Sequence, residues 1–362
     1  MLKKLKVKNY KSLRSQVINF EPFNILIGPN ASGKSNILDC LIFISDLVKM
    51  GLSEAIKTRG DYDHIVFSRD IEKDIEIRVD FIIDNLPGYY MIVFNQGIVK
   101  KEELVYNNEK IIRQETYYNR ILKTLAGEKR YQTESALINQ LSELILESHK
   151  KIREFMINWY LYQIVTSNIR RLQPVKRHRI LSEDGFNLAQ VLHTLLSEYP
   201  ELFYKIQDIL KQAIPEVETL LSPLTEDEIT KTYVAIRETG FKNPFDYHQL
   251  SDGTLKLLAY ITALYCLPEA KLLCFEEPEN FVHPRLLEFL VEILKKSGKQ
   301  IILSTHSPYF IDHLAPEDLI IVQKERGETK VERIREPEGI KQLLTDISLG
   351  ELWYSGEFGG TS

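Results

Sequence analysis

The chain has 362 residues, of which 44% are hydrophobic and 27% charged, and its formal net charge is −5. This composition is typical of a folded protein long enough for two or three domains, and the acidic balance excludes a globally basic nucleic-acid-binding protein. No apolar run reaches the roughly 20 residues of a membrane helix, and no signal peptide follows Met1–Lys4, so we expect a cytoplasmic protein with no membrane partner. Three cysteines lie far apart in apolar segments, and we interpret them as core residues: Cys40, Cys266 and Cys274.

The first residues predict strands. Alternating apolar and basic side chains over residues 2–9 indicate a strand with Leu5 and Val7 on its buried face, and a second strand is expected over 16–20. Residues 23–27 predict a third strand, which is almost wholly apolar.

Residues 28–35, Gly-Pro-Asn-Ala-Ser-Gly-Lys-Ser, follow this third strand and precede a predicted helix that ends near Gly51. The spacing G-x-x-x-x-G-K-[ST] is typical of a phosphate-binding loop, in which the glycines let backbone N–H groups surround a polyphosphate and Lys34 reaches its β- and γ-phosphates. Ser35 is placed to bind Mg²⁺, and the start of the helix favours the same anion. The predicted nucleotide-binding residues of this segment are Gly28, Asn30, Ser32, Gly33, Lys34, Ser35 and Asn36.

The middle of the chain alternates between strand and helix patterns. Residues 61–106 predict an antiparallel meander with a turn at Pro87-Gly88. Apolar residues at helical spacing over 133–165 predict one long helix or two, without the sustained heptads of a coiled coil. A further helical segment is expected over 187–212, and strand-like spacing returns over 231–237.

The densest positive segment of the chain surrounds Pro174. It is either a solvated loop or a contact with the phosphate backbone of DNA, and the sequence leaves both interpretations open. Its charged residues are Arg170, Arg171, Lys176, Arg177, His178 and Arg179.

Three later motifs accompany the phosphate loop. Leu250–Thr254, here called the signature turn, contains Ser-Asp-Gly and opens an apolar helix, although such a turn alone is a common N-cap. The strand 271–276 ends in two carboxylates, of which Glu276 would hold Mg²⁺ and Glu277 would orient or deprotonate a water molecule. The strand 299–304 precedes His306, whose ring could donate a hydrogen bond to a γ-phosphate and sense its loss.

The order of these motifs resembles the ATP-binding-cassette (ABC) ATPases, and among them the soluble branch of RecF, SMC and OLD-type proteins. The similar segments are the N-terminus through Asn36, the signature turn, Glu-Glu-Pro-Glu-Asn at 276–280 with His283-Pro284, and Ser-Thr-His-Ser-Pro at 304–308. The resemblance implies an α/β P-loop NTPase of ABC-ATPase type with a β-rich lobe and an inserted helical lobe. The expected division is 1–124 for the first part of the ATPase domain, 125–225 for the helical insertion and 226–362 for the second part.

The resemblance also implies that Ser251 and Gly253, with Asp252 between them, face the γ-phosphate held by a second subunit. ATP would then join a head-to-tail homodimer. Two residues depart from the family pattern, because Glu276 replaces an aspartate and Asp252 replaces a glycine. The added charge of Asp252 either faces away from phosphate or caps the helix. Gln96 is a weak candidate for the glutamine that usually links the nucleotide to the rest of the cassette.

The leading hypothesis is an ATPase that uses ATP and Mg²⁺, dimerises on ATP and controls a nucleic-acid-directed effector in antiphage defence or DNA repair. The segment after His306 is shorter than the nuclease domain of OLD-type chains, so a TOPRIM-type nuclease is expected on a separate polypeptide. The aromatic, glycine-rich segment 349–360 is either its docking element or a packed part of the ATPase. The alternatives are a RecF-like protein that binds DNA through 170–179, and a transporter ATPase subunit, which the meander and the helical insertion disfavour.

Overall fold

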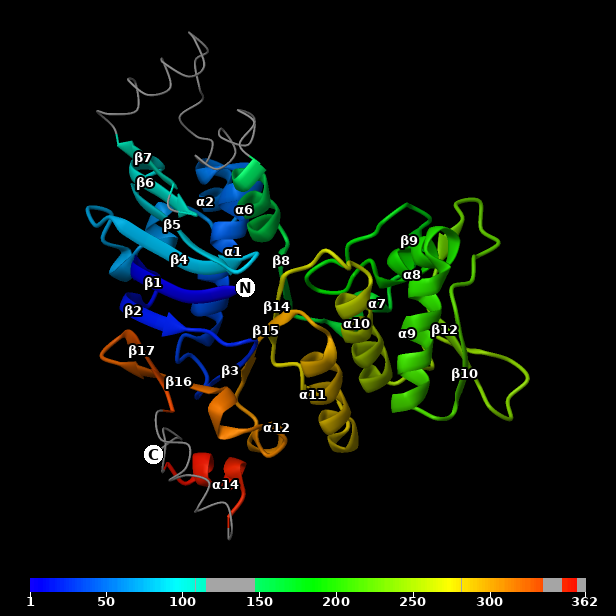
Figure 1. Cartoon of the computed structure of the whole chain (residues 1–362). Helices are drawn as coiled ribbons and strands as arrows, with labels where there is room; N and C mark the ends of the chain where they lie inside the picture. Colours follow the sequence, from blue (N-terminus) through cyan, green and yellow to red (C-terminus); the bar gives the residue numbers. More distant parts are fainter. Residues whose placement is uncertain (108, 115–146, 281, 335–346, 357–362) are drawn as a thin grey trace. The chain divides into compact units, whose positions relative to one another are not determined.

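The computed structural model describes residues 1–107, 109–114, 147–280, 282–334 and 347–356 (Figure 1). The chain divides into two compact units, one comprising Met1–Trp159 with Ala315–Ser362 and the other Tyr160–Leu314. The three-part division expected from the sequence stays a prediction.

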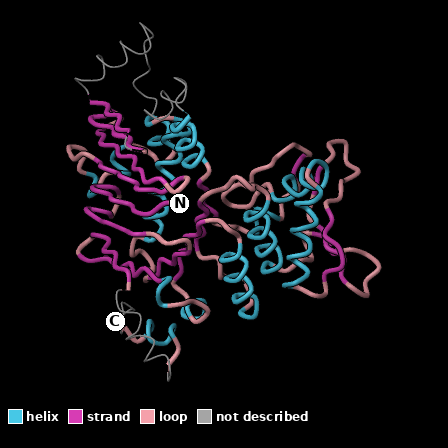
Figure 2. Tube along the Cα trace, in the orientation of Figure 1, coloured by secondary structure: helices cyan, strands magenta, loops and turns pink. Residues whose placement is uncertain are grey.

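The first unit contains an antiparallel six-stranded sheet, whose strands lie side by side in Figure 2. Leu5 and Val7 of the first strand are buried, as the alternation predicted, and Leu5 pairs with Val79 on the neighbouring strand. Alternation over 75–81 is also confirmed, because every second residue there is buried. In sheet order the strands are β2 (Leu13–Asn19), β1 (Leu2–Tyr10), β4 (Ile75–Ile83), β5 (Leu86–Asn95), β6 (Ile98–Tyr106) and β7 (Glu109–Gln114).

The turn predicted at Pro87-Gly88 is wrong by three residues. Asp84 and Asn85 connect β4 to β5 with φ angles of 51° and 62°, and Pro87 and Gly88 lie inside β5. Two consecutive positive φ angles match the right-handed twist of a two-residue hairpin, and asparagine and aspartate tolerate them best among residues with side chains. The short polar pair therefore forms the turn that the Pro-Gly pair was expected to form.

A second group of strands in the first unit carries the phosphate loop. β3 (Phe23–Ile27) is parallel to β16 (Leu319–Glu325), and β16 forms an antiparallel hairpin with β17 (Glu328–Arg333). α1 (Lys34–Met50) follows the loop and ends at Gly51, whose φ of 90° suits glycine. The predicted third strand and the helix after it are thus confirmed.

The remaining elements of the first unit are short. The start of the expected meander is helical instead of extended. The helix predicted over 133–165 ends at Ile157, and a strand begins at Trp159. The first part of that predicted helix lies outside the described residues. The tail segment begins as a helix with Leu352 and Trp353 buried. These elements are α2 (Leu52–Lys57), α3 (Tyr62–Ile65), η1 (Phe67–Arg69), α6 (Glu147–Ile157), η3 (Pro316–Asp318) and α14 (Leu349–Tyr354).

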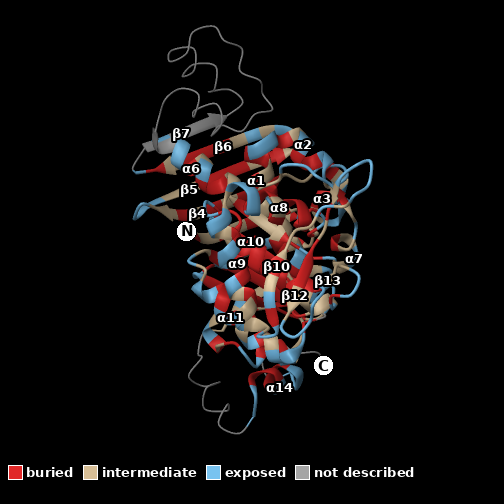
Figure 3. Ribbon diagram, turned by 90° about the vertical axis from the view of Figure 1, so that its right-hand side faces the viewer, coloured by how far each residue is buried: buried red, intermediate tan, exposed pale blue. Residues whose placement is uncertain are grey.

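The second unit is built around α10 (Asp252–Tyr265), which contacts four other helices and which Figure 3 colours largely as buried. β14 (Leu272–Glu276) and β15 (Gln300–Thr305) are buried parallel neighbours. The helices are α7 (Thr166–Ile169), α8 (Leu188–Glu198), α9 (Pro200–Ala213), η2 (Pro284–Leu286), α11 (Leu287–Lys296) and α12 (Pro308–Ile311). The short strands are β8 (Trp159–Tyr162), which starts at the unit boundary, β9 (Gln173–Pro174), β10 (Val217–Leu221), β11 (Lys231–Thr232), β12 (Ala235–Glu238) and β13 (Phe245–Asp246).

The three cysteines are reduced and fully buried, which confirms that they are core residues. In the described part of the chain, no helix combines the length and the hydrophobicity that a membrane crossing requires.

Candidate nucleotide site

The phosphate loop connects the buried strand β3 to α1 in the first unit, and its two glycines serve different purposes. Gly33 has a φ of +109°, which glycine adopts without the strain that a Cβ would add. At Gly28 an added Cβ would lie 2.0 Å from the carbonyl oxygen of Val322 in β16. The loop therefore depends on Gly33 for its backbone conformation and on Gly28 for its packing against β16.

The side chain of Lys34, the first residue of α1, reaches back to the beginning of the phosphate loop. Its ammonium Nζ donates to the carbonyl oxygens of Gly28 and Pro29 at 2.7 and 3.0 Å, and the residue is 6% exposed. Ser35 beside it is exposed on the first turn of α1. That turn contains no acidic residue, so its N–H groups and the helix dipole favour an anion at the loop.

The other three predicted loop residues have different environments. Asn30 is exposed, whereas the hydroxyl of Ser32 is buried and has no hydrogen-bond partner among the described residues. Asn36 donates from Nδ2 to the hydroxyl of Ser12 at 2.6 Å. The side chain of Asn36 thus holds the turn between β1 and β2.

The second unit contains the carboxylates, the histidine and the signature turn. Glu277 follows β14 with a φ of 43°, and its N–H donates to the carbonyl of Ser304 at 2.9 Å. Its two carboxylate oxygens accept from His306 Nδ1 and from Asn280 Nδ2, both at 2.8 Å. The structure therefore brings Glu277 and His306 into direct contact, and the left-handed backbone at Glu277 turns its side chain out of the strand alternation.

Glu276 has a carboxylate oxygen suited to a cation. The Oε1 atom is buried and has no hydrogen-bond partner among the described residues. An unpaired buried carboxylate oxygen is unfavourable unless a cation or a donor reaches it, and oxygen ligands are those that Mg²⁺ prefers. Glu276 in the second unit and Ser35 in the first unit each carry an oxygen of the kind that Mg²⁺ prefers.

The signature turn caps α10 and is held by Arg170. The Ser251 hydroxyl accepts from Thr254 N–H at 3.0 Å, which confirms the N-cap. The Asp252 carboxylate forms an ion pair with Arg170 at 2.6 Å, and the guanidinium also donates to the Leu250 carbonyl at 2.7 Å. The charge of Asp252 is therefore directed to a cation of the same unit.

Sequence reasoning missed Lys256 and Glu279. Lys256 is buried on α10 and donates from Nζ to the Glu277 carbonyl at 3.2 Å, and burial lowers its pKa to about 8. Burial also raises the pKa of Glu279, whose Oε1 accepts from the Thr305 hydroxyl. These residues connect the signature helix to the segments that carry Glu277 and His306. The sequence does single out Lys256, because it is the one charged residue within the apolar run 255–264.

Three of the six charged residues in segment 170–179 pair with acidic side chains of the second unit. Besides Arg170, Arg177 pairs with Glu198 at 2.8 Å and Arg179 approaches Glu269 at 3.6 Å. Arg171 and Lys176 are exposed. Intramolecular ion pairs reduce the positive charge that this segment offers to a phosphate backbone.

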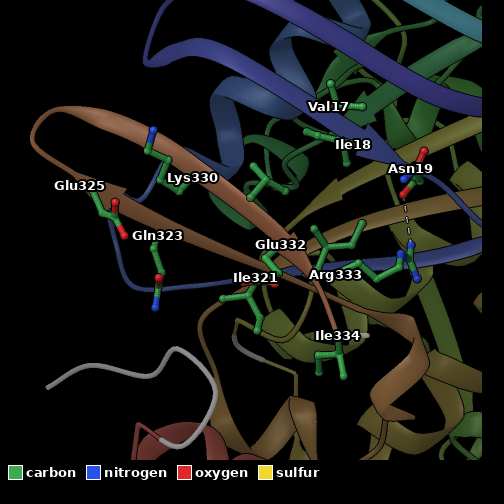
Figure 4. A pocket seen from close by; sticks show the side chains of 12 residues that line it. Val17, Ile18, Asn19, Ile321, Gln323, Glu325, Lys330, Glu332, Arg333 and Ile334 are labelled. Atoms are coloured by element: carbon green, nitrogen blue, oxygen red, sulfur yellow. Dashed lines mark hydrogen bonds between the residues drawn. The ribbon is translucent and has the colours of Figure 1, made fainter. Parts of the chain in front are cut away.

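Two further features lie away from the motif residues. Gln96, the candidate linking glutamine, occupies the β5–β6 turn with a φ of 45°. A groove of about 880 Å³ lies in the first unit between β2 and the β16–β17 hairpin, and Figure 4 shows the side chains that line it. Val17, Ile321 and Ile334 are among its lining residues, and none of the predicted site residues lines it.

Comparison with known proteins identifies the family. The family model described as "AAA domain, putative AbiEii toxin, Type IV TA system" matches residues 23–312. This match contains the phosphate loop, the signature turn, both carboxylates and His306.

Curated relatives extend the comparison. The chain is 26% identical to an OLD nuclease of Thermus scotoductus over 91% of its length and 25% identical to the Old nuclease of Escherichia phage P2 over 96%. It spans 63% of the length of each of these proteins. A shorter segment, 21% of the chain, is 36% identical to the RecF protein of Streptococcus gordonii and covers 19% of that protein.

Solved structures show the same fold. A Pyrococcus furiosus SMC head domain bound to the C-terminal domain of ScpA matches 95% of this chain and 98% of its own, with 14% identity and a TM-score of 0.61. The SMC head domain of Thermotoga maritima matches 92% of this chain and 99% of its own, with 14% identity and a TM-score of 0.51. The predicted α/β fold of ABC-ATPase type is confirmed. The chain therefore belongs to the AAA-domain family matched over residues 23–312, and it is an ABC-type ATPase that is similar to the RecF, SMC and OLD proteins.

Proposed function

We propose that this protein is a cytoplasmic switch that binds ATP with Mg²⁺, dimerises head to tail around it, hydrolyses it and thereby controls an effector that acts on nucleic acid. The observation that carries the proposal is the contact between Glu277 and His306 at the carboxyl ends of adjacent parallel strands. A carboxylate held by an imidazole at this position suits the activation of a water molecule.

Nucleotide binding is assigned to the phosphate loop. Lys34 would exchange the carbonyl oxygens of Gly28 and Pro29 for phosphate oxygens, because an anion attracts an ammonium more strongly than a neutral carbonyl does. Ser35 and Glu276 would hold Mg²⁺, which when bound neutralises charge that develops on the phosphates.

Hydrolysis is assigned to Glu277, with His306 as its partner. A carboxylate oxygen only accepts, so His306 must donate from Nδ1 to Glu277. The neutral ring then presents Nε2 as an acceptor. Donation from Nε2 to a γ-phosphate, as expected for this histidine, therefore requires the doubly protonated ring.

Dimerisation is assigned to the signature turn. Ser251 and Gly253 stand at the positive end of α10, whose 14 residues give its N-terminus the electrostatic character that phosphate favours. Arg170 neutralises Asp252 beside them, which removes the repulsion that this residue would otherwise exert on phosphate. We propose that this surface faces the phosphate loop of a second copy.

The effector is proposed to be a nuclease of TOPRIM type that acts in antiphage defence or DNA repair. The support is the similarity to proteins named OLD nuclease. Direct DNA binding in the manner of RecF is the weaker candidate, because Arg170, Arg177 and Arg179 bind acidic side chains of the second unit.

Glu277→Gln tests the proposed chemistry. The amide keeps the shape of the side chain and removes its basicity, so we expect ATP affinity within about threefold of wild type and a loss of ATP turnover of at least about 100-fold, with a dimer that persists on ATP. The measurements are nucleotide titration, phosphate release and light scattering after size exclusion.

Glu292→Gln, which changes an exposed carboxylate on α11 of the same unit, is the matched control and should leave turnover unchanged. Normal turnover in Glu277→Gln would refute the role of Glu277. A wild-type protein that remains monomeric with ATP would refute the dimer.

A further inference from the structure

A chain of hydrogen bonds connects four segments of the first unit beneath the phosphate loop. Asn36 Nδ2 donates to Ser12 Oγ at 2.6 Å, Ser12 Oγ lies 2.6 Å from Thr329 Oγ1, and Thr329 Oγ1 donates to the Ser32 carbonyl at 2.9 Å. The participants come from α1, the β1–β2 turn, β17 and the phosphate loop. The backbone strengthens the same junction, because Thr329 N–H donates to the Ser12 carbonyl at 2.9 Å.

The direction of this chain is determined by the number of protons available. A threonine hydroxyl has one hydrogen, and that of Thr329 is directed to the Ser32 carbonyl. Thr329 must therefore accept from Ser12, which in turn accepts from Asn36. Each hydroxyl both donates and accepts, an arrangement in which neighbouring hydrogen bonds strengthen one another.

Fixing the Ser32 carbonyl also fixes the next peptide N–H. The Ser32–Gly33 peptide is planar and trans, so its carbonyl and its N–H point in opposite directions. Thr329 holds the carbonyl on its own side, which leaves the Gly33 N–H on the side away from β17. Inward-pointing N–H groups of this loop are the donors that bind a polyphosphate.

The loop and β17 are tightly packed where Thr329 meets Gly33. Thr329 is fully buried, and a Cβ on Gly33 would lie 1.9 Å from Thr329 Oγ1. Gly28 is pressed equally closely against Val322 of β16. The β16–β17 hairpin therefore packs on both glycines of the loop.

We propose that Thr329 is a positioning residue for nucleotide binding, which orients the Gly33 N–H through the Ser32 carbonyl and couples the β16–β17 hairpin to the phosphate loop. The inference rests on the proposed ATP site and adds a residue that is not part of the phosphate-loop motif. Because coupling is reciprocal, nucleotide at the loop should also stabilise the hairpin.

The test compares Thr329→Val, which keeps the shape and removes the hydroxyl, with Thr329→Ser, which keeps the hydroxyl. We expect Thr329→Val to lose about tenfold in affinity for MgATP and Thr329→Ser to stay within about threefold of wild type. In wild type, MgATP should slow hydrogen exchange at the β17 amides 330–333, and Thr329→Val should lose most of this protection. KM should rise more than kcat falls.

Thr194→Val is the matched control for the removal of a buried hydroxyl. Thr194 lies in the second unit, where its hydroxyl donates to the Gln190 carbonyl at 2.9 Å and accepts from His178 N–H at 3.0 Å. Thr194→Val therefore removes two side-chain hydrogen bonds, as Thr329→Val does. We expect similar losses of melting temperature for Thr194→Val and Thr329→Val without nucleotide, and a loss of MgATP affinity only for Thr329→Val.

Equal affinity of Thr329→Val and wild type would overturn the inference and leave the proposed function intact. Failure of the wild-type protein to bind MgATP would instead refute the proposed function. If MgATP slows hydrogen exchange in β17 of Thr329→Val as much as in wild type, the hairpin is coupled to the loop by another route. That result would refute the role of Thr329.

Discussion

Asp252 shows how one unusual residue is accommodated at a turn that is proposed to face phosphate. Its carboxylate stands in the first turn of α10, where it interacts favourably with the helix dipole but would repel a phosphate. Arg170 binds the carboxylate and also donates to the Tyr247 and Leu250 carbonyls, so it organises the whole turn. Arg170 therefore has a structural use that its place in a basic segment did not indicate.

Replacing Arg170 and Asp252 separately should give unequal losses of stability. The side chains are 24% and 44% exposed, so solvent screens the ion pair and Asp252→Asn should lower the free energy of unfolding by less than about 1 kcal/mol. Arg170→Ala should cost about 2 kcal/mol, because it also leaves backbone carbonyls without their donor. Urea unfolding measures both, and equal losses would contradict the role of Arg170 in holding the carbonyls.

The middle of α1, the helix that follows the phosphate loop, is anchored by the guanidinium of Arg59. Arg59 donates to Asp39 at 2.7 Å and to Asp46 at 2.9 Å, both on α1, and its guanidinium lies 5.2 Å from the centre of the Phe43 ring. Lys11 pairs with Asp39 at 2.6 Å. Burial alone would raise the pKa of Asp39, but Arg59 and Lys11 outweigh it and hold that pKa below its usual value.

Arg59→Met should destabilise the first unit by about 2–3 kcal/mol at pH 7, because two largely buried carboxylates lose their cation. In wild type the contribution of Asp39 is present above its unfolded pKa and is lost as the pH falls through its lower folded pKa. Urea unfolding between pH 7 and 3 should therefore show a smaller acid-induced loss for Arg59→Met.

Arg14→Met is the control for this element. Arg14 is 62% exposed and pairs with Glu328, so solvent screens this ion pair and its removal should change the free energy of unfolding far less than Arg59→Met does. A loss as large as that of Arg59→Met would show that charge removal in general, rather than the anchoring of α1, is responsible.

At the scale of the whole molecule, the proposed site is composite. The phosphate loop belongs to the first unit, and the signature turn, the carboxylates and His306 belong to the second. The proposed dimer places the signature turn of one copy against the phosphate loop of the other. Such a head-to-tail pair closes with twofold symmetry and contains two equivalent sites.

Mixing two inactive variants tests this arrangement. Lys34→Ala weakens the phosphate loop, and Gly253→Asp places a second acid in the signature turn. Each variant alone should lack ATPase activity, whereas an equal mixture should recover up to about a quarter of the wild-type rate, because half of the random dimers contain one intact site. A mixture as inactive as its components would contradict a site shared between copies.

The chemistry-bearing motifs were readable from sequence because each is a local arrangement of particular residue types. Glycines at 28 and 33, the Ser251 cap and the strand-terminal Glu276 and Glu277 act within short segments whose conformation their own residues favour. The same local reasoning failed at Asp84-Asn85 and at Trp159. In both places the pairing of strands determined the backbone, and tertiary packing outweighs weak local preferences.

Only the tertiary structure determined which distant segments are in contact. The Thr329–Ser32, Arg170–Asp252 and Glu277–His306 pairs join residues 297, 82 and 29 positions apart. The spacing of threonine, arginine and histidine in the sequence does not predict such partners, because their hydrogen bonds depend on which strands and turns become neighbours. The sequence by itself thus identified an ATPase and predicted its reactive groups, whereas the fold determined which side chains contact those residues and neutralise their charges.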